Sequence, residues 1–265
     1  MDKLEDKPYA VITGASQGLG KAFAEELAER GYPLILISLP NQDLNKLALF
    51  LNAKYKIKTV CYETDFSNPS NVQTLTSWIN KQYDIQILIN NAGIGGSQKM
   101  EEANLNSINN ILHVNIHATS ILCHQLLPNL KRQSQSYILN VSSIAAFSPV
   151  GYKTVYPASK SFIYSFSLGL AAELKKDNVF VSVISPGPMK TNQEITSRIE
   201  KQGFIGRLTL LDPKNVAQFS TKKMFKKESL ILINPFSWII SKLIPVKIKI
   251  QMLTKIVKRE LQQHV

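Results

Sequence analysis

Short apolar runs alternate with longer helical patterns through roughly the first 190 residues of this 265-residue chain. The run IQILIN at Ile85–Asn90 is apolar almost throughout, which is typical of a strand buried on both faces of a sheet. Strands that alternate with helices in this way pair in parallel, and the helices form the crossover connections. The pattern therefore predicts a doubly wound α/β fold, with a mostly parallel sheet of about seven strands and helices on both faces.

We expect a single domain, because a chain of this length can fill one α/β core and no linker, repeat or low-complexity segment interrupts it. The expected strands span residues 9–13, 33–39, 59–63, 85–90, 137–141, 179–184 and 230–233. The expected helices span residues 19–30, 43–53, 69–82, much of 101–130, 155–176 and 212–225.

Composition favours a globular protein of the cytoplasm. Hydrophobic residues make up 44% and charged residues 19% of the chain, the balance of a folded domain. The two cysteines, Cys61 and Cys123, are too few for a disulfide framework and fit a reducing compartment. The opening residues MDKLEDKP are charged, and no run of about 18 apolar residues follows, so we expect neither a signal peptide nor a membrane span.

A glycine-rich turn, TGASQGLG at residues 13–20, follows the first expected strand. Such a turn lets the backbone approach a pyrophosphate, and the helix that follows it presents unpaired N–H groups. The spacing GxxxGxG differs from the general GxGxxG fingerprint, and glycines needed only for tight helix–strand packing are the alternative. The position in the first strand-to-helix turn favours dinucleotide binding and a Rossmann-like fold.

Tyr156 and Lys160 lie four residues apart in YPASK, and Ser143 lies thirteen positions before Tyr156. Residues i and i+4 share one face of a helix, so the phenol and the ammonium can enter the same site. A nearby cation lowers the pKa of a tyrosine from its usual value of ~10. The pair suits proton exchange with a carbonyl oxygen during hydride transfer, although this spacing also occurs by chance.

Further motifs appear in a fixed order: Asp65-Phe66, NNAG at 90–93, Asn115, and SPGPMKT at 185–191. Together with the glycine turn, Ser143 and YPASK, they resemble the short-chain dehydrogenase/reductase family as far as residue 191. The resemblance implies an NAD(P)-dependent oxidoreductase that interconverts a carbonyl, such as a ketone or a 3-oxoacyl group, and a secondary alcohol. It also implies a homodimer or homotetramer formed through the helices that carry Asn115 and Tyr156.

The resemblance implies a role for each matched residue. Tyr156 would be the general acid/base, Lys160 would lower its pKa and hold the nicotinamide ribose, and Ser143 would hydrogen-bond the substrate oxygen. Asn115 would order a water next to Lys160, and Ser142 would face away. Asp65 would touch the adenine, Asn91 and Gly93 would flank the ribose, Met189 and Thr191 would contact the carboxamide after Pro186 and Gly187, and the pyrophosphate turn would comprise Gly14, Ser16, Gly18, Leu19 and Gly20.

The end of the second expected strand bears on the choice of cofactor. NAD-binding folds usually place an acid ~20 residues after the glycines, on the adenosine ribose. Here the strand ends ISLPN at residues 37–41, and the first acid is Asp43. This favours NADP(H) over NAD(H), with Ser38 and Asn41 as donors, although Leu39 stands where an arginine often binds the 2′-phosphate.

Other functions are less well supported. His113 and His117 have a spacing that can hold zinc, but no third ligand lies nearby in sequence, so we expect ordinary helix residues and no metal. Ser142 and Ser143 lack a G-x-S-x-G context, which disfavours a serine hydrolase. A non-catalytic dinucleotide sensor or a membrane-peripheral scaffold remains the alternative to an enzyme.

The C-terminal part of the chain is basic and apolar. Residues 201–265 hold thirteen Lys or Arg against three acids, which is +10 of the net +12. Pro235 and Pro245 predict two short helices in it, which could pack on the core or a second subunit, cover a hydrophobic substrate pocket, or lie on an anionic membrane. The lysines alternate with aliphatic residues, so we expect no nucleic-acid partner. We expect residues 1–190 to form the cofactor-binding and catalytic core and 191–265 to cover the substrate.

Overall fold

The computed structural model describes residues 7–189, 210–234 and 243–262. Among them, one parallel sheet of seven strands has the order β3-β2-β1-β4-β5-β6-β7, which confirms the predicted fold. The strands are β1 (Tyr9–Thr13), β2 (Leu34–Ser38), β3 (Thr59–Glu63), β4 (Ile85–Asn90), β5 (Ser136–Val141), β6 (Val179–Ile184) and β7 (Leu230–Ile231). Successive strands are added on one side of β1 as far as β3 and on its other side from β4 onward, so the topological switch point lies between β1 and β4. Open α/β sheets bind ligands in the crevice at such a point.

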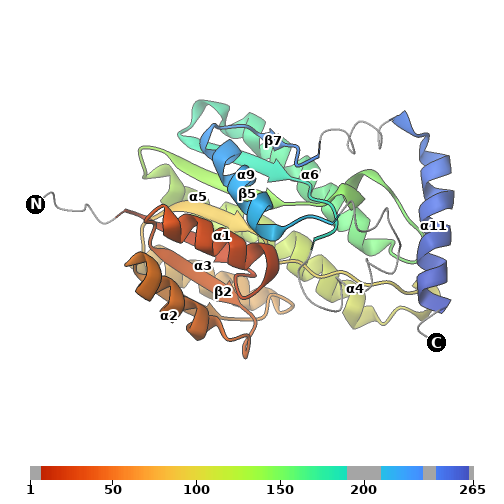
Figure 1. Ribbon diagram of the computed structural model, residues 1–265, viewed down its shortest axis with the longest axis horizontal. Coiled ribbons are helices and arrows are strands. Elements are labelled where there is room, and N and C mark those ends of the chain that lie inside the picture. The colour runs from red at the N-terminus through yellow and green to blue at the C-terminus, as the bar shows by residue number, and fades with distance from the viewer. Residues whose placement is uncertain (1–6, 190–209, 235–242, 263–265) are drawn as a thin grey trace, which may run out of the picture.

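Helices cover both faces of the sheet (Figure 1). One face carries α1 (Gly18–Glu29), α2 (Leu44–Tyr55) and α9 (Pro213–Phe225). The other carries α3 (Pro69–Gln82), α5 (Ala118–Lys131) and α6 (Val155–Glu173). Two hydrophobic cores result, one on each side of the sheet.

The strands are apolar throughout because both of their faces are buried. Successive residues of a strand point to opposite faces, and in β1 the side chains of Ala10 and Ile12 enter the core under α1. Val11, between them, enters the core under α3 and α5. All three are 0% exposed, so the polar alternation of a half-exposed strand cannot occur here.

The long helix expected within residues 101–130 is divided into four elements. They are a 3₁₀ turn η1 (Met100–Glu102), then α4 (Leu105–Leu112), a π-helical turn η2 (His113–His117) and α5. Other elements also differ from prediction. β7 has two residues rather than four, and α6 ends at Glu173 before a 3₁₀ turn η4 (Leu174–Lys176). The bounds of α1, α2, α9, β2 and β5 differ from the expected ones by one or two residues. Periodicity in sequence does not distinguish an α turn from a π turn, since both keep the chain helical.

The last helix, α11 (Val246–Gln262), stands across the carboxyl end of the sheet in Figure 1. It begins directly after Pro245, as predicted, whereas the helix expected before that proline falls partly on residues 235–242, outside the described ranges. Its Thr254 hydroxyl accepts a 2.9 Å hydrogen bond from the Gly151 N–H, and Lys249 Nζ donates one of 2.9 Å to the Phe147 carbonyl. Of the helices within the described ranges, none has both the length and the apolar character needed to cross a membrane.

Candidate active site

A cavity of about 1090 Å³ opens at the carboxyl ends of the central strands. The predicted site residues that line it are Gly14, Ser16, Gly18, Leu19, Asp65, Asn91, Gly93, Ser143, Tyr156, Lys160, Pro186, Gly187 and Met189. Two more, Gly20 and Asn115, support its wall from behind. Thr191 lies outside the described residues. The fold therefore gathers into one place residues that are spread over most of the chain.

The glycine turn links β1 to α1 along the floor of this cavity. Gly14 and Gly18 have φ values of 64° and 53°, in the left-handed region that glycine adopts without strain. Helix α1 begins at Gly18 and has no acidic side chain in its first turn. The unpaired N–H groups of that turn, and the positive end of the helix dipole, therefore face the cavity with no carboxylate in the turn itself.

The end of β4 holds the glycine turn in place. The side-chain amide of Asn91 donates to the carbonyl oxygens of Thr13 at 3.0 Å and Gly14 at 3.2 Å. Thr13 Oγ1 accepts from the N–H groups of Asn91 and Ala92, both at 3.0 Å. The resemblance assigned Asn91 to the ribose, but its amide is bonded to the turn. A Cβ on Gly20 would lie 2.0 Å from the Gly14 carbonyl oxygen, so Gly20 serves close packing beneath the turn.

Tyr156 and Lys160 lie one turn apart on α6, as the spacing predicted, and both line the cavity. Lys160 Nζ lies 5.9 Å from the centre of the Tyr156 ring and donates a 3.0 Å hydrogen bond to the Val141 carbonyl at the end of β5. Ser143 follows β5 and shares a side-chain hydrogen bond with Tyr156. The neighbouring Ser142 hydroxyl instead donates to the Lys160 carbonyl at 2.7 Å, away from the phenol, as expected.

Burial governs the protonation of this group. It lowers the pKa of Lys160 to about 8, because a charged ammonium is unfavourable in a nearly dry site. It raises the pKa of Tyr156, and the hydrogen bond from Ser143 offsets this in part. The expectation that Lys160 lowers the pKa of Tyr156 does not hold for the chain alone, since desolvation of the phenol outweighs every other effect.

Asn115 occupies the π turn between α4 and α5 and is 1% exposed. Its amide donates to the Ile94 carbonyl and to Ser159 Oγ, and its Oδ1 accepts from the Ile94 N–H, each at 2.9 Å. A Cβ on Gly93 would lie 3.0 Å from Lys160 Nζ and 3.3 Å from Asn115 Oδ1. The π turn thus brings Asn115 against Gly93 and Ile94, and Gly93 lies between Asn115 and Lys160. Such turns are frequent at functional sites.

The two histidines that flank Asn115 have their rings 6.2 Å apart. His113 Nδ1 lies 2.9 Å from the Ser67 carbonyl oxygen, which fixes that ring against the segment after β3. In the described part of the chain, no cluster of three or more His, Cys, Asp or Glu side chains could hold a metal ion.

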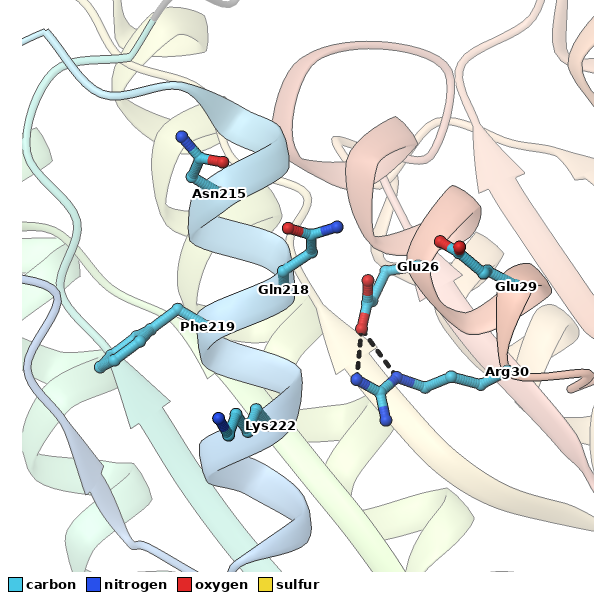
Figure 2. Close-up of a pocket in the computed structure, with 7 residues that line it drawn as sticks. All are labelled: Glu26, Glu29, Arg30, Asn215, Gln218, Phe219 and Lys222. Atoms are coloured by element: carbon cyan, nitrogen blue, oxygen red, sulfur yellow. Dashed lines mark hydrogen bonds and ion pairs between the residues drawn. The ribbon is translucent and has the colours of Figure 1, made fainter.

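A second, smaller hollow of about 480 Å³ lies between α1 and α9, away from these residues. Figure 2 shows Glu26 of α1 paired with Arg30, the residue that follows the helix, and both facing Gln218 of α9. The Arg30 Nη2–Glu26 Oε1 distance is 2.6 Å, and the guanidinium also lies 5.4 Å from the centre of the Phe225 ring. The contact between Arg30 and Phe225 links the end of α1 to α9, and none of the predicted site residues lines the hollow.

A family model for short chain dehydrogenases matches residues 8–202. The chain belongs to this family. The match covers β1 through β6, and therefore the glycine turn and every predicted catalytic residue.

Three relatives illustrate the similarity. Very-long-chain 3-oxoacyl-CoA reductase-B of Danio rerio is 34% identical over 67% of this chain and 58% of its own length, so the chain spans less than two thirds of that relative. An uncharacterised oxidoreductase of Staphylococcus saprophyticus is 32% identical over 82% of this chain and 91% of its own. L-sorbose reductase of Gluconobacter frateurii, solved with NADPH and L-sorbose, is 25% identical with a TM-score of 0.77, covering 88% of this chain and 97% of that one.

The cavity of this short-chain dehydrogenase fits a nicotinamide dinucleotide. The glycine turn leaves backbone open at one end, where side chains would otherwise stand. Tyr156, Lys160, Pro186 and Gly187 line the same cavity. Ser38, Leu39 and Gln42 line the cavity near the end of β2, and Asp65 is the one carboxylate among the lining residues that the structure describes.

Several residues of the site carried no recognised signal in the sequence. Thr13 belongs to the TGASQGLG motif, but its role in accepting hydrogen bonds from Asn91 and Ala92 depends on the neighbouring strand β4. Ser159, inside YPASK, bonds Asn115. Gly95 lies beside the Tyr156 ring, where an added Cβ would make an ordinary contact at 3.4 Å. Leu261 of α11 also lines the cavity, although it lies about a hundred residues after Lys160 in the sequence. No local sequence pattern could indicate that Leu261 belongs to the site.

Proposed function

We propose that this short-chain dehydrogenase is an NAD(P)-dependent oxidoreductase that interconverts a carbonyl and a secondary alcohol. The observation that carries the proposal is the convergence of Ser143, Tyr156 and Lys160 in a cavity that the glycine turn also lines. When bound, the nicotinamide cofactor supplies or accepts the hydride. The protein then has to orient the substrate and manage one proton at the reacting oxygen.

Tyr156 is the proposed acid/base. Burial raises the pKa of its phenol, so at neutral pH the phenol is protonated and can donate to the oxygen as negative charge develops there. Ser143 is the proposed second donor to that oxygen, and two donors held in place before the reaction stabilise the developing alkoxide. In the opposite direction, the phenolate accepts the proton of the alcohol.

Lys160 is the proposed cation of the site. With a pKa of about 8 it is mostly an ammonium at neutral pH. Its Nζ lies 5.9 Å from the centre of the Tyr156 ring, so it places a positive charge beside the phenol, although burial dominates the pKa of the phenol in the chain alone. We propose that its remaining N–H groups hold the cofactor ribose while the Val141 carbonyl fixes its position. Asn115, which is buried and fully hydrogen-bonded, is proposed to position the segment at Gly93 and Ile94 beside Lys160.

NADP(H) is the proposed cofactor in preference to NAD(H). The cavity wall at the end of β2 consists of Ser38, Leu39 and Gln42, with no carboxylate among them to repel a 2′-phosphate. The nearest acid in sequence, Asp43, forms an ion pair with Lys46 at 2.7 Å. The Ser38 hydroxyl donates to the Leu39 carbonyl, so it is less available as a phosphate donor than the sequence suggested.

A hydrophobic or acyl substrate is proposed, covered by part of residues 191–265. Ile94, Val114 and Leu261 are among the apolar residues that line the cavity. The reductase of Danio rerio named above acts on very-long-chain 3-oxoacyl-CoA, which supports an acyl substrate here.

We also propose a homodimer or homotetramer in the cytoplasm. The partly exposed Phe162 on α6, stacked on Phe166 at 5.8 Å, supports an interface on that helix. Cys61 and Cys123 are both free thiols, which supports a reducing compartment.

Turnover of ketones, aldehydes and 3-oxoacyl thioesters with NADPH or NADH tests the proposed reaction. Tyr156→Phe should lower kcat by about 100-fold or more, since general acid catalysis contributes about that much, and should leave cofactor affinity nearly unchanged. Tight cofactor binding without turnover of any substrate would favour the non-catalytic sensor instead.

A further inference from the structure

Helix α11 has two apolar faces. The inner face, with Val257 only 7% exposed and Thr254 bonded to Gly151, packs on the protein. The outer face carries Ile248, Met252 and Ile256, which are spaced four residues apart and so form one stripe along the helix. We call these three residues the outer stripe.

The outer stripe is open to solvent. Ile248, Met252 and Ile256 are 48%, 58% and 45% exposed, Val246 at the start of the helix is 51% exposed, and Leu243, which precedes the helix, is 75% exposed. A helix packed on a soluble protein normally presents polar residues on the face opposite its core. Contiguous apolar surface of this kind marks a site of interaction.

Lys255 and Arg259 border the outer stripe, and Lys247 and Lys258 lie farther round the helix. Lys247, Lys255, Lys258 and Arg259 are all exposed. Lys255 and Arg259 lie three residues after Met252 and Ile256, on the same side of the helix as the stripe. The segment 243–262 contains a single acid, Glu260. Long basic side chains can extend past a buried apolar stripe and keep their charges in water.

We propose that the outer face of α11 docks on the surface of an anionic lipid membrane. Apolar side chains would enter the boundary between headgroups and acyl chains, and the four cations would meet lipid phosphates. A second copy of the chain fits this face less well, because a symmetric contact would bring two sets of the same cations together and repel. The proposal concerns a binding surface and stands independently of the proposed reaction.

Docking in this way would bring lipid close to the active site. The inner face of α11 touches Phe147 and Gly151, in the segment after β5, and Leu261 lines the cavity itself. A helix with its side chains is about 10 to 12 Å across, so the cavity wall would lie about one helix diameter from the membrane surface.

Flotation with vesicles tests the proposal on the full chain. We expect the protein to float with vesicles of phosphatidylcholine mixed with phosphatidylglycerol, much less with phosphatidylcholine alone, and less in high salt. Replacing the outer stripe together (Ile248→Ser, Met252→Ser and Ile256→Ser) should lower partitioning on the order of 10-fold or more. Leu49→Ser on α2, where the leucine is 69% exposed, is the matched control and should bind like the wild type.

A second variant separates charge from apolar contact. Lys255→Gln with Arg259→Gln should lower partitioning into the anionic vesicles about 10-fold or more. Lys46→Gln with Lys81→Gln, on α2 and α3, should not. The proposal is overturned if the wild type fails to float, if the outer-stripe variant floats as well as the wild type, or if that variant lowers the molar mass of the protein without vesicles. The last result would assign the face to a second copy of the chain.

Discussion

The ammonium of Lys160 donates its hydrogen bond to the main-chain carbonyl of Val141, 3.0 Å away at the end of β5. Lys160 is only 5% exposed, and no carboxylate contributes to the shift of its pKa, which burial alone lowers to about 8. A buried cation without a paired anion destabilises a fold, because desolvation is only partly offset by one neutral acceptor. The position of this side chain therefore serves the site rather than the stability of the protein.

Lys160→Met should stabilise the protein in the absence of cofactor while abolishing turnover. The fall of the pKa from 10.5 to about 8 means that the buried ammonium destabilises the folded state by about 3 kcal/mol at neutral pH. The substitution removes this cost but also removes the hydrogen bond to Val141, which lowers the stability by about 1 kcal/mol. The net gain in the free energy of unfolding should be about 2 kcal/mol, measured by urea denaturation.

The stability that Lys160→Met gains over the wild type should decrease as the pH rises. Folding lowers the pKa of Lys160, so the unfolded chain binds the proton more tightly, and the stability of the wild type rises as the pH increases from about 8 towards 10.5. The advantage of Lys160→Met should therefore be largest below about pH 8 and shrink above it. Lys81→Met, at an exposed position of α3, is the control and should show neither effect. A Lys160→Met variant that is less stable than the wild type at neutral pH would refute this account.

Gly93→Ala should impair the site, and Gly95→Ala should do so much less. A Cβ on Gly93 would meet Lys160 Nζ at 3.0 Å and Asn115 Oδ1 at 3.3 Å, and hydrogen bonds fix both atoms. A Cβ on Gly95 would meet the Tyr156 ring at 3.4 Å, an ordinary contact. Since displacing Lys160 or Asn115 costs about one hydrogen bond, we expect kcat/KM to fall on the order of 10-fold for Gly93→Ala. Equal activity of the two variants would show that Lys160 can move freely.

The elements that could be predicted residue by residue are those whose local signals agree. Helix α3 starts at Pro69, as predicted, because proline suits the first turn and the Asn68 side chain accepts from the Ser70 N–H. The strands at 59–63, 85–90 and 179–184 were also predicted with their observed bounds, since each is a β-rich apolar run between turn residues.

The features that could not be predicted depend on contacts between distant segments. The π turn at Asn115 is stabilised by hydrogen bonds to Ile94, a residue on another strand end, and nothing in the local sequence encodes it. The pKa of Tyr156 rises because neighbouring segments bury the phenol, whereas sequence alone indicated only the lysine four residues later. The placement of Leu261 in the cavity depends likewise on where α11 packs.

Leu39→Asp should weaken the use of NADPH selectively. Leu39 lies after β2, lines the cavity and is 48% exposed, so an aspartate there would be ionised and close to a 2′-phosphate. Repulsion between two anions should raise the KM for NADPH about 10-fold or more and leave the KM for NADH unchanged or lower. Leu39→Asn has nearly the same shape without the charge and should behave like the wild type. Preference of the wild type for NADH would contradict the assignment of NADP(H) directly.

Thr254→Val should weaken substrate binding without affecting the cofactor. The substitution keeps the shape of the side chain but leaves the Gly151 N–H without the acceptor it has at 2.9 Å, which costs about 1 to 3 kcal/mol. Gly151 follows Ser143 and precedes Tyr156, so a loosened segment should raise the KM for the carbonyl substrate several-fold. Thr74→Val on α3, where the hydroxyl donates to the Ser70 carbonyl at 3.1 Å, is the matched control and should not change it.

Gly151→Ala should produce the same kinetic change for a different physical reason. A Cβ there would lie 2.7 Å from Thr254 Cγ2, so the Thr254 side chain or the helix that carries it would have to shift. Steady-state kinetics with both substrates varied, together with hydrogen exchange of the α11 amides, would measure both effects. If α11 forms part of the substrate site, both variants should raise the KM for the carbonyl and speed exchange in α11. Faster exchange with an unchanged KM would show that this helix packs on the cavity without contributing to substrate binding.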